Sequence, residues 1–351
     1  MRLNAEGIAA GMVLKECRDA IAERVTNLFF EARPQLEQRW QGARQKVVED
    51  NRYHLDYLCE ALFFGRPALF TEYAGWAAEL LERLNIPRET LAFDLELMRA
   101  AVASELPEQG GTLACQYLDA AIANVEGSVS VPATHIGGTG PLDGLAREYL
   151  AALLRGERHS ASALIFAAVD GGTSIKDIYL LVFQRVQHEV GRLWHSNEIG
   201  VAQEHYCTAC TQLIMSQLYP RVFSTERNGR RLVSTCVGGD LHEIGARMVS
   251  DFFEMEGWDT FFLGANTPIS GTLQQVTERK PHVLAISATM SFNVKRVEDL
   301  IAATRAAGSP PRILVGGAAF NSLPGLWKDV GADGYARNAA DAIALAEAWS
   351  E

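Results

Sequence analysis

The last third of the chain alternates short apolar runs with amphipathic stretches. The runs are four to seven residues long and rich in Val, Ile and Leu, as in strands that are buried on both faces of a parallel sheet. Between the runs, apolar residues recur at three- and four-residue spacing, as on the buried side of a helix. The alternation predicts right-handed βαβ crossovers and a five-stranded parallel sheet. The candidate strands are 231–237, 259–263, 283–287, 312–316 and 333–336.

The residues before this region have helical periodicity throughout. A stretch with Pro132, Pro141 and four glycines, 131–144, is typical of a linker and separates two helical regions. We therefore predict a helical domain at 1–130, a linker at 131–144, a four-helix bundle at 145–225 and an α/β domain at 226–351. The clearest helical stripes are Leu69, Tyr73, Trp76, Leu80 and Leu84 in the first region, and Ile178, Leu181, Val182, Val186, Val190 and Leu193 in the second.

Composition and charge narrow the function classes. The chain has 351 residues and a net charge of −11, which argues against a nucleic-acid surface because phosphate binding needs clustered Lys and Arg. Its six cysteines are scattered, which fits a reduced compartment better than a disulfide framework. The sequence shows neither a signal peptide nor a transmembrane run, and we expect a cytoplasmic protein. No catalytic nucleophile triad or phosphate-binding loop is recognisable, so we assign no catalytic residues.

The loop after the first candidate strand carries the most informative residues. The sequence Gly-Gly-Asp-Leu-His-Glu-Ile-Gly, 238–245, follows strand 231–237 and precedes a helical pattern. His242 is thus presented at the carboxyl end of a strand, where open α/β sheets bind ligands. Asp240 could hydrogen-bond the imidazole and fix its tautomer, while Gly238 and Gly239 permit close approach of a ligand.

Asp-x-His-x-x-Gly resembles the signature of cobalamin-binding domains, which have a flavodoxin-like, Rossmann-like fold. The resemblance implies that His242 is the lower axial ligand of cobalt and that the vitamin binds base-off. It also implies that Ser287 and the two glycines Gly316 and Gly317, each at a strand end, line the slot for the nucleotide tail. The cofactor-binding residues implied in this domain are Gly239, Asp240, Leu241, His242, Glu243, Ile244, Gly245, Ser287, Thr289, Gly316 and Gly317.

A second resemblance lies in the helical bundle before this domain. Trp194 is followed after nine residues by Glu204 and His205. This spacing resembles the cap of CarH-type adenosylcobalamin photoreceptors, in which the tryptophan packs on the adenosyl group and the Glu-His pair contacts it. The resemblance implies that His195 is the candidate upper cobalt ligand after light breaks the Co–C bond. CarH-type repressors also carry a winged helix, which this chain lacks, so direct nucleic-acid binding is not expected.

The whole architecture is similar to that of the photocobilins, in which a globin-like domain binds a bilin. We therefore predict an α plus α/β protein with an N-terminal helical, globin-like domain, a helical-bundle cap and a cobalamin-binding domain. The predicted function is a cytoplasmic light sensor that binds adenosylcobalamin base-off with His242 on cobalt. Biliverdin or another linear tetrapyrrole would be a second chromophore, without a residue that we can name for its attachment, and the partner would be a downstream signalling protein.

Three alternatives remain open from the sequence. The chain could be a corrinoid protein that carries methyl groups for partner methyltransferases. It could also be a storage or interaction module that binds cobalamin without a light response. For residues 1–130, a dimerisation and relay bundle competes with the bilin site and would make the protein a homo-oligomer.

Overall fold

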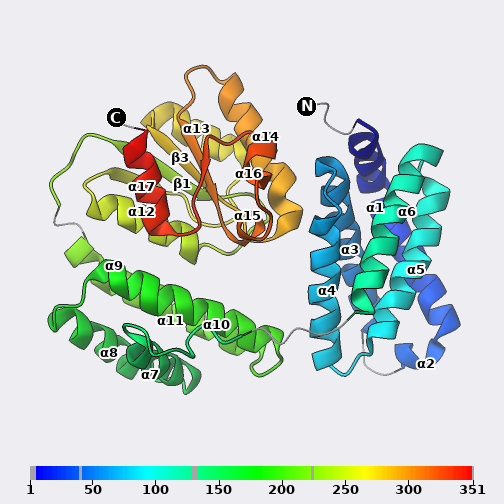
Figure 1. The fold of residues 1–351 in the computed structure, drawn as a ribbon, viewed down its shortest axis with the longest axis horizontal. Coiled ribbons are helices and arrows are strands. Elements are labelled where there is room, and N and C mark those ends of the chain that lie inside the picture. Colours follow the sequence, from blue (N-terminus) through cyan, green and yellow to red (C-terminus); the bar gives the residue numbers. More distant parts are fainter. Residues whose placement is uncertain (1–4, 39–41, 128–132, 223–224, 350–351) are drawn as a thin grey trace. The chain divides into compact units, whose positions relative to one another are not determined.

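The computed structural model describes residues 5–38, 42–127, 133–222 and 225–349. The chain divides into two compact units, Met1–Ser130 and Val131–Glu351, and each is described by itself (Figure 1). The parts of the predicted domains and linker at 1–4, 39–41, 128–132, 223–224 and 350–351 lie outside the described residues.

The first unit is helical, as the periodicity predicts. Its two longest helices, α1 and α3, pack along each other, and α4 and α5 both pack on α6. Prolines at 34, 67, 87 and 107 stand at helix starts, where a missing N–H costs nothing. Gly65 ends α3 with a positive φ of 60°. The helices are α1 (Ala5–Ala32), α2 (Pro34–Glu37), α3 (Ala43–Phe64), α4 (Ala68–Arg83), α5 (Arg88–Glu105) and α6 (Glu108–Val125).

The second unit begins with a bundle of helices that we call the cap, residues 143–222. The cap differs from the sequence prediction in one segment, because Ile178–Phe183 forms a π-helix, η1, instead of continuing the regular helical stripe. The wider π turn directs Ile178, Tyr179, Val182 and Phe183 into the core. The other cap helices are α7 (Asp143–Leu154), α8 (Arg158–Asp170), α9 (Ile175–Asp177), α10 (Gln184–His195) and α11 (Val201–Val222).

A five-stranded parallel sheet follows the cap, and the fold prediction is confirmed. The strand order is β2-β1-β3-β4-β5, which is the order of flavodoxin-like sheets. The strands are β1 (Arg231–Cys236), β2 (Asp259–Phe262), β3 (Val283–Ser287), β4 (Arg312–Gly316) and β5 (Gly334–Tyr335). The helical segments between and after them are α12 (Ile244–Met255), α13 (Ile269–Arg279), η2 (Ser291–Asn293), α14 (Val294–Ala306), α15 (Ala318–Ser322), α16 (Leu326–Asp329) and α17 (Ala339–Ala348).

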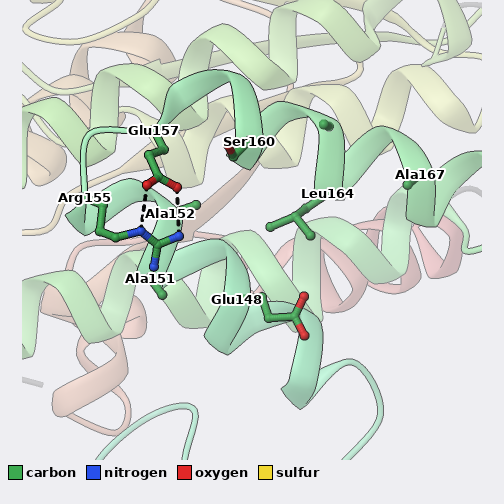
Figure 2. Close-up of a pocket in the computed structure, with 9 residues that line it drawn as sticks. Glu148, Ala151, Ala152, Arg155, Glu157, Ser160, Leu164 and Ala167 are labelled. Carbon is green, nitrogen blue, oxygen red and sulfur yellow. Dashed lines mark hydrogen bonds and ion pairs between the residues drawn. The ribbon is translucent and has the colours of Figure 1, made fainter.

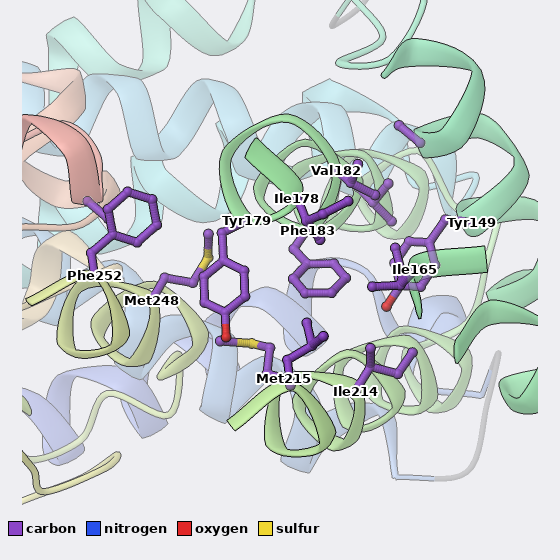
Figure 3. Packing of buried hydrophobic residues seen from close by; sticks show 14 of the residues in the cluster. Tyr149, Ile165, Ile178, Tyr179, Val182, Phe183, Ile214, Met215, Met248 and Phe252 are labelled. Carbon is purple, nitrogen blue, oxygen red and sulfur yellow. The ribbon is translucent and has the colours of Figure 1, made fainter. Parts of the chain in front are cut away.

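The cap and the sheet share one hydrophobic core. Figure 3 shows Tyr179 and Phe183 of η1 close to Met215 of α11 and to Met248 and Phe252 of α12. At this junction the Tyr179 hydroxyl donates a 2.9 Å hydrogen bond to Asp251 of α12. Burial raises the pKa of Asp251 to about 6, although this hydrogen bond opposes the rise. The side of α12 that faces away from the sheet is therefore covered by apolar cap residues.

A polar contact joins the same two elements beside the core. Gln212 of α11 donates a 2.7 Å hydrogen bond to Glu243, the residue before α12. Arg247 reaches back to the carbonyl oxygen of Gln212 and to the hydroxyl of Ser216, at 3.3 and 2.9 Å. The start of α12, directly after the loop with His242, is thus attached to the cap. Among the described residues, no helix is long and apolar enough to cross a membrane.

Candidate functional site

The loop with His242 lies at the topological switch point of the sheet. The chain leaves β1 toward β2 on one side, whereas β3 pairs with β1 on the other side. Cys236, the last residue of β1, pairs in register with Ser287, the last residue of β3, and Ser287 pairs with Gly316 of β4. The predicted residues at the three strand ends are therefore neighbours along one edge of the sheet. Crevices at such an edge are where α/β proteins bind ligands.

The His242 side chain is exposed, and a hydrogen bond to one of its ring nitrogens orients it. Its side chain is 58% exposed, and its Nδ1 lies 2.9 Å from Oδ1 of Asp240. The Asp240–His242 hydrogen bond that the spacing predicts is therefore present. The bond engages Nδ1 and leaves Nε2 as the ring nitrogen for a metal. The hydrogen bond that His242 donates to Asp240 raises the pKa of His242, and the charge of Glu204 in the cap adds to this effect.

Asp240 ties this loop to the loop after β3. Its side chain is buried, at 1% exposure. One oxygen accepts from the backbone N–H of His242 at 3.0 Å, and the other accepts from the backbone N–H groups of Thr289 and Met290. Burial alone would raise the pKa of Asp240, but the hydrogen bonds from His242 and from these N–H groups together lower it. The carboxylate is thus held ionised, ready to orient the imidazole.

The glycines at the end of β4 lie where a side chain cannot be accommodated. Gly317 has a φ of 97°, and a Cβ on it would overlap the carbonyl oxygen of Ala288. A Cβ on Gly316 would lie 3.0 Å from the carbonyl oxygen of Ala336. Glycine at 317 therefore lets this backbone approach the one after β3, and glycine at 316 lets it approach the one after β5.

The other predicted residues of the sheet domain surround this loop. Leu241 is 73% exposed beside His242, and Glu243 accepts from the N–H of Ala265 at 3.0 Å as well as from Gln212. Ile244 and Gly245 form the first turn of α12. The loop is thereby anchored at its end by the cap and by the loop after β2.

The site residues predicted in the cap lie on either side of the turn between α10 and α11. Trp194 is half-buried and His195 is buried, both at the end of α10. Glu204 and His205 lie in the first turns of α11 and hydrogen-bond each other. Glu204 is the cap residue that acts electrostatically on His242. The side chain of His205 is 74% exposed.

Three residues that the sequence reasoning missed also contact the loop. Asn266, after β2, accepts from the N–H of Gly239 at 2.7 Å and donates its own N–H to the carbonyl oxygen of Asp240 at 2.9 Å. Asn293 and Arg296, in η2 and the first turn of α14, face Gly239. None of the three belongs to a motif with a recognisable spacing, although Asn266 has a left-handed φ of 52°, which only few residue types adopt readily.

The donor set fits a corrinoid. An imidazole nitrogen oriented by a buried carboxylate suits a transition metal such as cobalt. Beside this loop, both polar side-chain atoms of the fully buried Asn293 have no partner among the described residues. His242 would hold the cobalt, and the edge formed by Ser287, Thr289 and Gly316 would receive the nucleotide tail.

A surface pocket of about 590 Å³ lies elsewhere, between α7 and α8 of the cap (Figure 2). Many of its lining side chains are small and apolar, and Arg155 and Glu157, which form an ion pair, lie at one end. It contains none of the predicted site residues. The lining residues are Glu148, Ala151, Ala152, Arg155, Glu157, Ser160, Ala163, Leu164 and Ala167.

Comparison with known families matches three stretches of the chain. Residues 230–344 match a model described as a B12 binding domain, and residues 145–219 match a second model with the same description. Residues 2–125 match a model described as a phycobilisome protein. The two B12 matches coincide with the sheet domain and the cap.

Curated relatives cover between 33% and 54% of the chain. Dimethylamine corrinoid protein 3 of Methanosarcina acetivorans is 32% identical over 119 residues, which are 33% of this chain and 54% of that protein. The dimethylamine corrinoid protein of Methanosarcina barkeri is 30% identical over 195 residues, 49% of this chain and 90% of that protein. The chain belongs to the corrinoid protein family. It spans about half the length of the first curated relatives that it matches.

A solved structure agrees with the fold of this corrinoid protein. The monomethylamine corrinoid protein of Methanosarcina barkeri superimposes with a TM-score of 0.53 at 20% identity, over 59% of this chain and 98% of that one. At this identity the likeness concerns the fold. Together with the two B12 domain matches, the relatives show that the chain binds cobalamin.

The light-sensor hypothesis is wrong. The relatives of this corrinoid protein are methylamine corrinoid proteins, and nothing in the comparisons supports a CarH-type photoreceptor or a signalling partner. The physical reason is that the cap, residues 145–219, matches a general B12 binding domain model, so the spacing from Trp194 to Glu204 does not identify a photoreceptor. The methyl-carrier alternative agrees better with these relatives.

Proposed function

We propose that this corrinoid protein carries a methyl group on cobalt for partner methyltransferases. The single observation behind the proposal is the 30% identity to a dimethylamine corrinoid protein over 90% of that protein's length. When bound, the corrinoid supplies a cobalt that can accept and release a methyl group. Methyltransferases replace the signalling protein as the proposed partners, and small methylated compounds such as methylamines are the proposed methyl donors.

The residues of the chain have distinct roles in this proposal. His242 would hold the cobalt through Nε2, the ring nitrogen that Asp240 leaves available. Asp240 accepts the Nδ1 hydrogen, fixes the tautomer and makes the imidazole a stronger donor. Trp194 and His195 cover the upper face from the end of α10, and Glu204 and His205 do so from α11.

The test is reconstitution of the full chain with cobalamin. We expect His242→Ala to retain less cobalamin and to lose the protein nitrogen ligand, seen by electron paramagnetic resonance of the Co(II) form. His159→Ala, a change at an exposed histidine of α8, is the control and should bind as wild type does. Retention of the vitamin with its own dimethylbenzimidazole on cobalt in the unsubstituted protein would contradict the proposal.

The second group bound to the cobalt, called the upper ligand here, is tested by reconstitution with methylcobalamin or adenosylcobalamin. A methyl carrier should bind methylcobalamin and, with a methyltransferase and a methyl donor, regenerate it from the Co(I) form. The adenosyl group that the cap spacing predicts is the alternative upper ligand. Markedly tighter binding of adenosylcobalamin, without methyl turnover in the presence of any methylamine methyltransferase, would favour that alternative.

We also propose that residues 1–130 hold a linear tetrapyrrole. The match of residues 2–125 to a phycobilisome protein model supports this second proposal. The interior of this unit also contains a carboxyl group without a cationic partner among the described residues, Asp94, whose hydrogen bond comes from Asn51 at 3.4 Å. Oδ1 of Asn51 is buried, and no residue in the described part of the chain hydrogen-bonds it. Such groups suit the N–H and carbonyl groups of pyrrole rings.

Expression together with a haem oxygenase tests this proposal. We expect the purified chain to absorb in the red, and Asp94→Asn to shift or weaken that band. A colourless product that elutes as a dimer would instead favour the dimerisation and relay bundle, and with it a homo-oligomer.

A further inference from the structure

The start of α14 contacts the loop with His242 through two residues that have no role so far. The guanidinium of Arg296 donates a hydrogen bond from Nη1 to the carbonyl oxygen of Gly238. A Cβ on Gly239 would overlap this guanidinium nitrogen and would lie 3.2 Å from Oδ1 of Asn293. The backbone at Gly239 therefore lies directly against both side chains, which explains why a residue without a side chain stands there.

Asn293 is unusual because its side chain makes no hydrogen bond. It is 0% exposed, and neither Nδ2 nor Oδ1 has a partner among the described residues. Buried amides are nearly always paired, since an unpaired one loses its hydrogen bonds to water without compensation. The group next to it is the loop that presents the proposed cobalt ligand. Gly239 is the loop residue beside this amide, since a Cβ on it would lie 3.2 Å from Oδ1 of Asn293.

The loop is held from a second direction as well. Asn266 accepts from the N–H of Gly239 and donates to the carbonyl oxygen of Asp240, at 2.7 and 2.9 Å. The peptide groups from 238 to 240 are thus fixed between the loop after β2 and the start of α14. Because Asp240 in turn orients the imidazole, any shift at Gly239 is passed on to His242.

We propose that Asn293 and Arg296 form a latch that positions the loop of His242 for cobalt, and that cobalamin binding completes the hydrogen bonds of Asn293. Arg296 holds the loop in position through its hydrogen bond to the carbonyl oxygen of Gly238. Asn293 takes its partner from the loop backbone at Gly239 when His242 moves onto the metal. Both are positioning residues, which act through Asp240 and His242. The latch rests on the proposed ligation of cobalt by His242.

The latch predicts opposite effects of one substitution on the two states of the protein. Asn293→Leu keeps the side-chain volume and removes the unpaired polar atoms. We expect the cobalamin-free protein to unfold at the same or a higher temperature, and the dissociation constant of cobalamin to rise by about tenfold, the lower end of effects seen when residues that orient metal ligands are changed. A purely structural role would lower the melting temperature of the free protein and leave the dissociation constant unchanged.

Arg296 is tested by a matched pair of substitutions on the same helix. Arg296→Met removes the hydrogen bond to Gly238, and Arg296→Lys retains a donor and should restore part of the affinity. Arg305→Met is the control, because Arg305 also lies on α14 and donates to a backbone carbonyl, that of Gly331, at 2.7 Å. Only the changes at Arg296 should weaken cobalamin binding.

Electron paramagnetic resonance of Co(II) cobalamin bound to protein with ¹⁵N-labelled histidine tests the latch separately from the proposed ligation of cobalt by His242. Nitrogen splitting from the labelled protein should be strong in wild type and should weaken in Asn293→Leu and Arg296→Met. If it disappears in His242→Ala while both latch variants behave as wild type, the latch is wrong and the ligation stands. If His242→Ala leaves the splitting unchanged, the proposed ligation itself is wrong.

Discussion

Asp94 is a carboxyl group in the interior of the N-terminal unit. Burial raises its pKa to about 7, and the hydrogen bond from Asn51 opposes the rise only in part. In the unfolded chain the carboxyl group loses its proton near pH 4, so the unfolded state is favoured increasingly as the pH rises from about 4 to 7. Below this window the group is protonated in both states, and above it the loss of stability is constant.

This titration gives a pH-dependent prediction. Asp94→Asn should be as stable as wild type at pH 4 and more stable at pH 8, by up to about 4 kcal/mol, because a neutral amide needs no deprotonation. Urea unfolding of both proteins at several pH values measures the difference. Asp119→Asn, at an exposed residue of α6, is the control. Parallel pH profiles for Asp94→Asn and wild type would contradict the assigned pKa.

Gly317 gives a second prediction at the same scale. Alanine there meets both a φ of 97° and the backbone carbonyl of Ala288, which cannot move aside as a flexible side chain could. We expect Gly317→Ala to lower the free energy of unfolding by more than about 1 kcal/mol and to weaken cobalamin binding. Gly144→Ala, where a Cβ meets nothing within 4 Å, should be neutral in both thermal melts and cobalamin titrations.

At the scale of elements, the sequence predicted the sheet well and the cap less well. Apolar runs of strand length end where β1 to β5 end, within a few residues, because burial on both faces demands unbroken hydrophobic runs. The π-helix at Ile178–Phe183 could not be predicted, since its apolar residues also satisfy an ordinary helical stripe. The extra residue per turn is stabilised by tertiary packing on α12, which leaves no local signal.

The same element carries a prediction about the junction of cap and sheet. Tyr179→Phe removes the hydroxyl that donates to Asp251 and leaves a buried carboxyl group without it. We expect a loss of about 1–3 kcal/mol in the free energy of unfolding. Tyr335→Phe is the control, because the Tyr335 hydroxyl donates to Asn321 at an exposed site. Equal denaturation midpoints for the two variants would show that the buried bond adds nothing.

Within the site, the sequence predicted the residues that a short motif spells out and missed those that the fold assembles. Asp240 and His242 are two residues apart, and their hydrogen bond follows from that spacing. Asn266, Asn293 and Arg296 come from other loops and reach the same backbone only after the sheet has formed. Their types are common at surfaces and helix starts, so no pattern distinguishes them.

At the scale of the whole molecule, the error in function has a clear origin. The predicted light sensor depended on a cap spacing and on the overall order of domains, and neither specifies the group above the cobalt. The relatives reported above are methylamine corrinoid proteins, and they favour the methyl-carrier alternative over the light sensor. A motif that two families share thus identifies the cofactor but not its use.

The division into two compact units leads to a prediction for the intact chain. The proposed cobalamin residues all lie in the unit Val131–Glu351. We expect residues 131–351, expressed alone, to fold and to bind cobalamin with the affinity and absorption spectrum of the full chain. Isothermal titration of both proteins makes the comparison. A large loss of affinity in the shorter protein would show that the N-terminal unit contributes to the site.

The hydrophobic core that runs from the cap into α12 limits how a methyltransferase, the proposed partner, could reach the proposed cobalt site. Swinging the whole cap away would expose Tyr179, Phe183 and Phe252 to water and break the bond to Asp251. A partner methyltransferase would therefore have to reach the proposed site while the cap stays packed on α12.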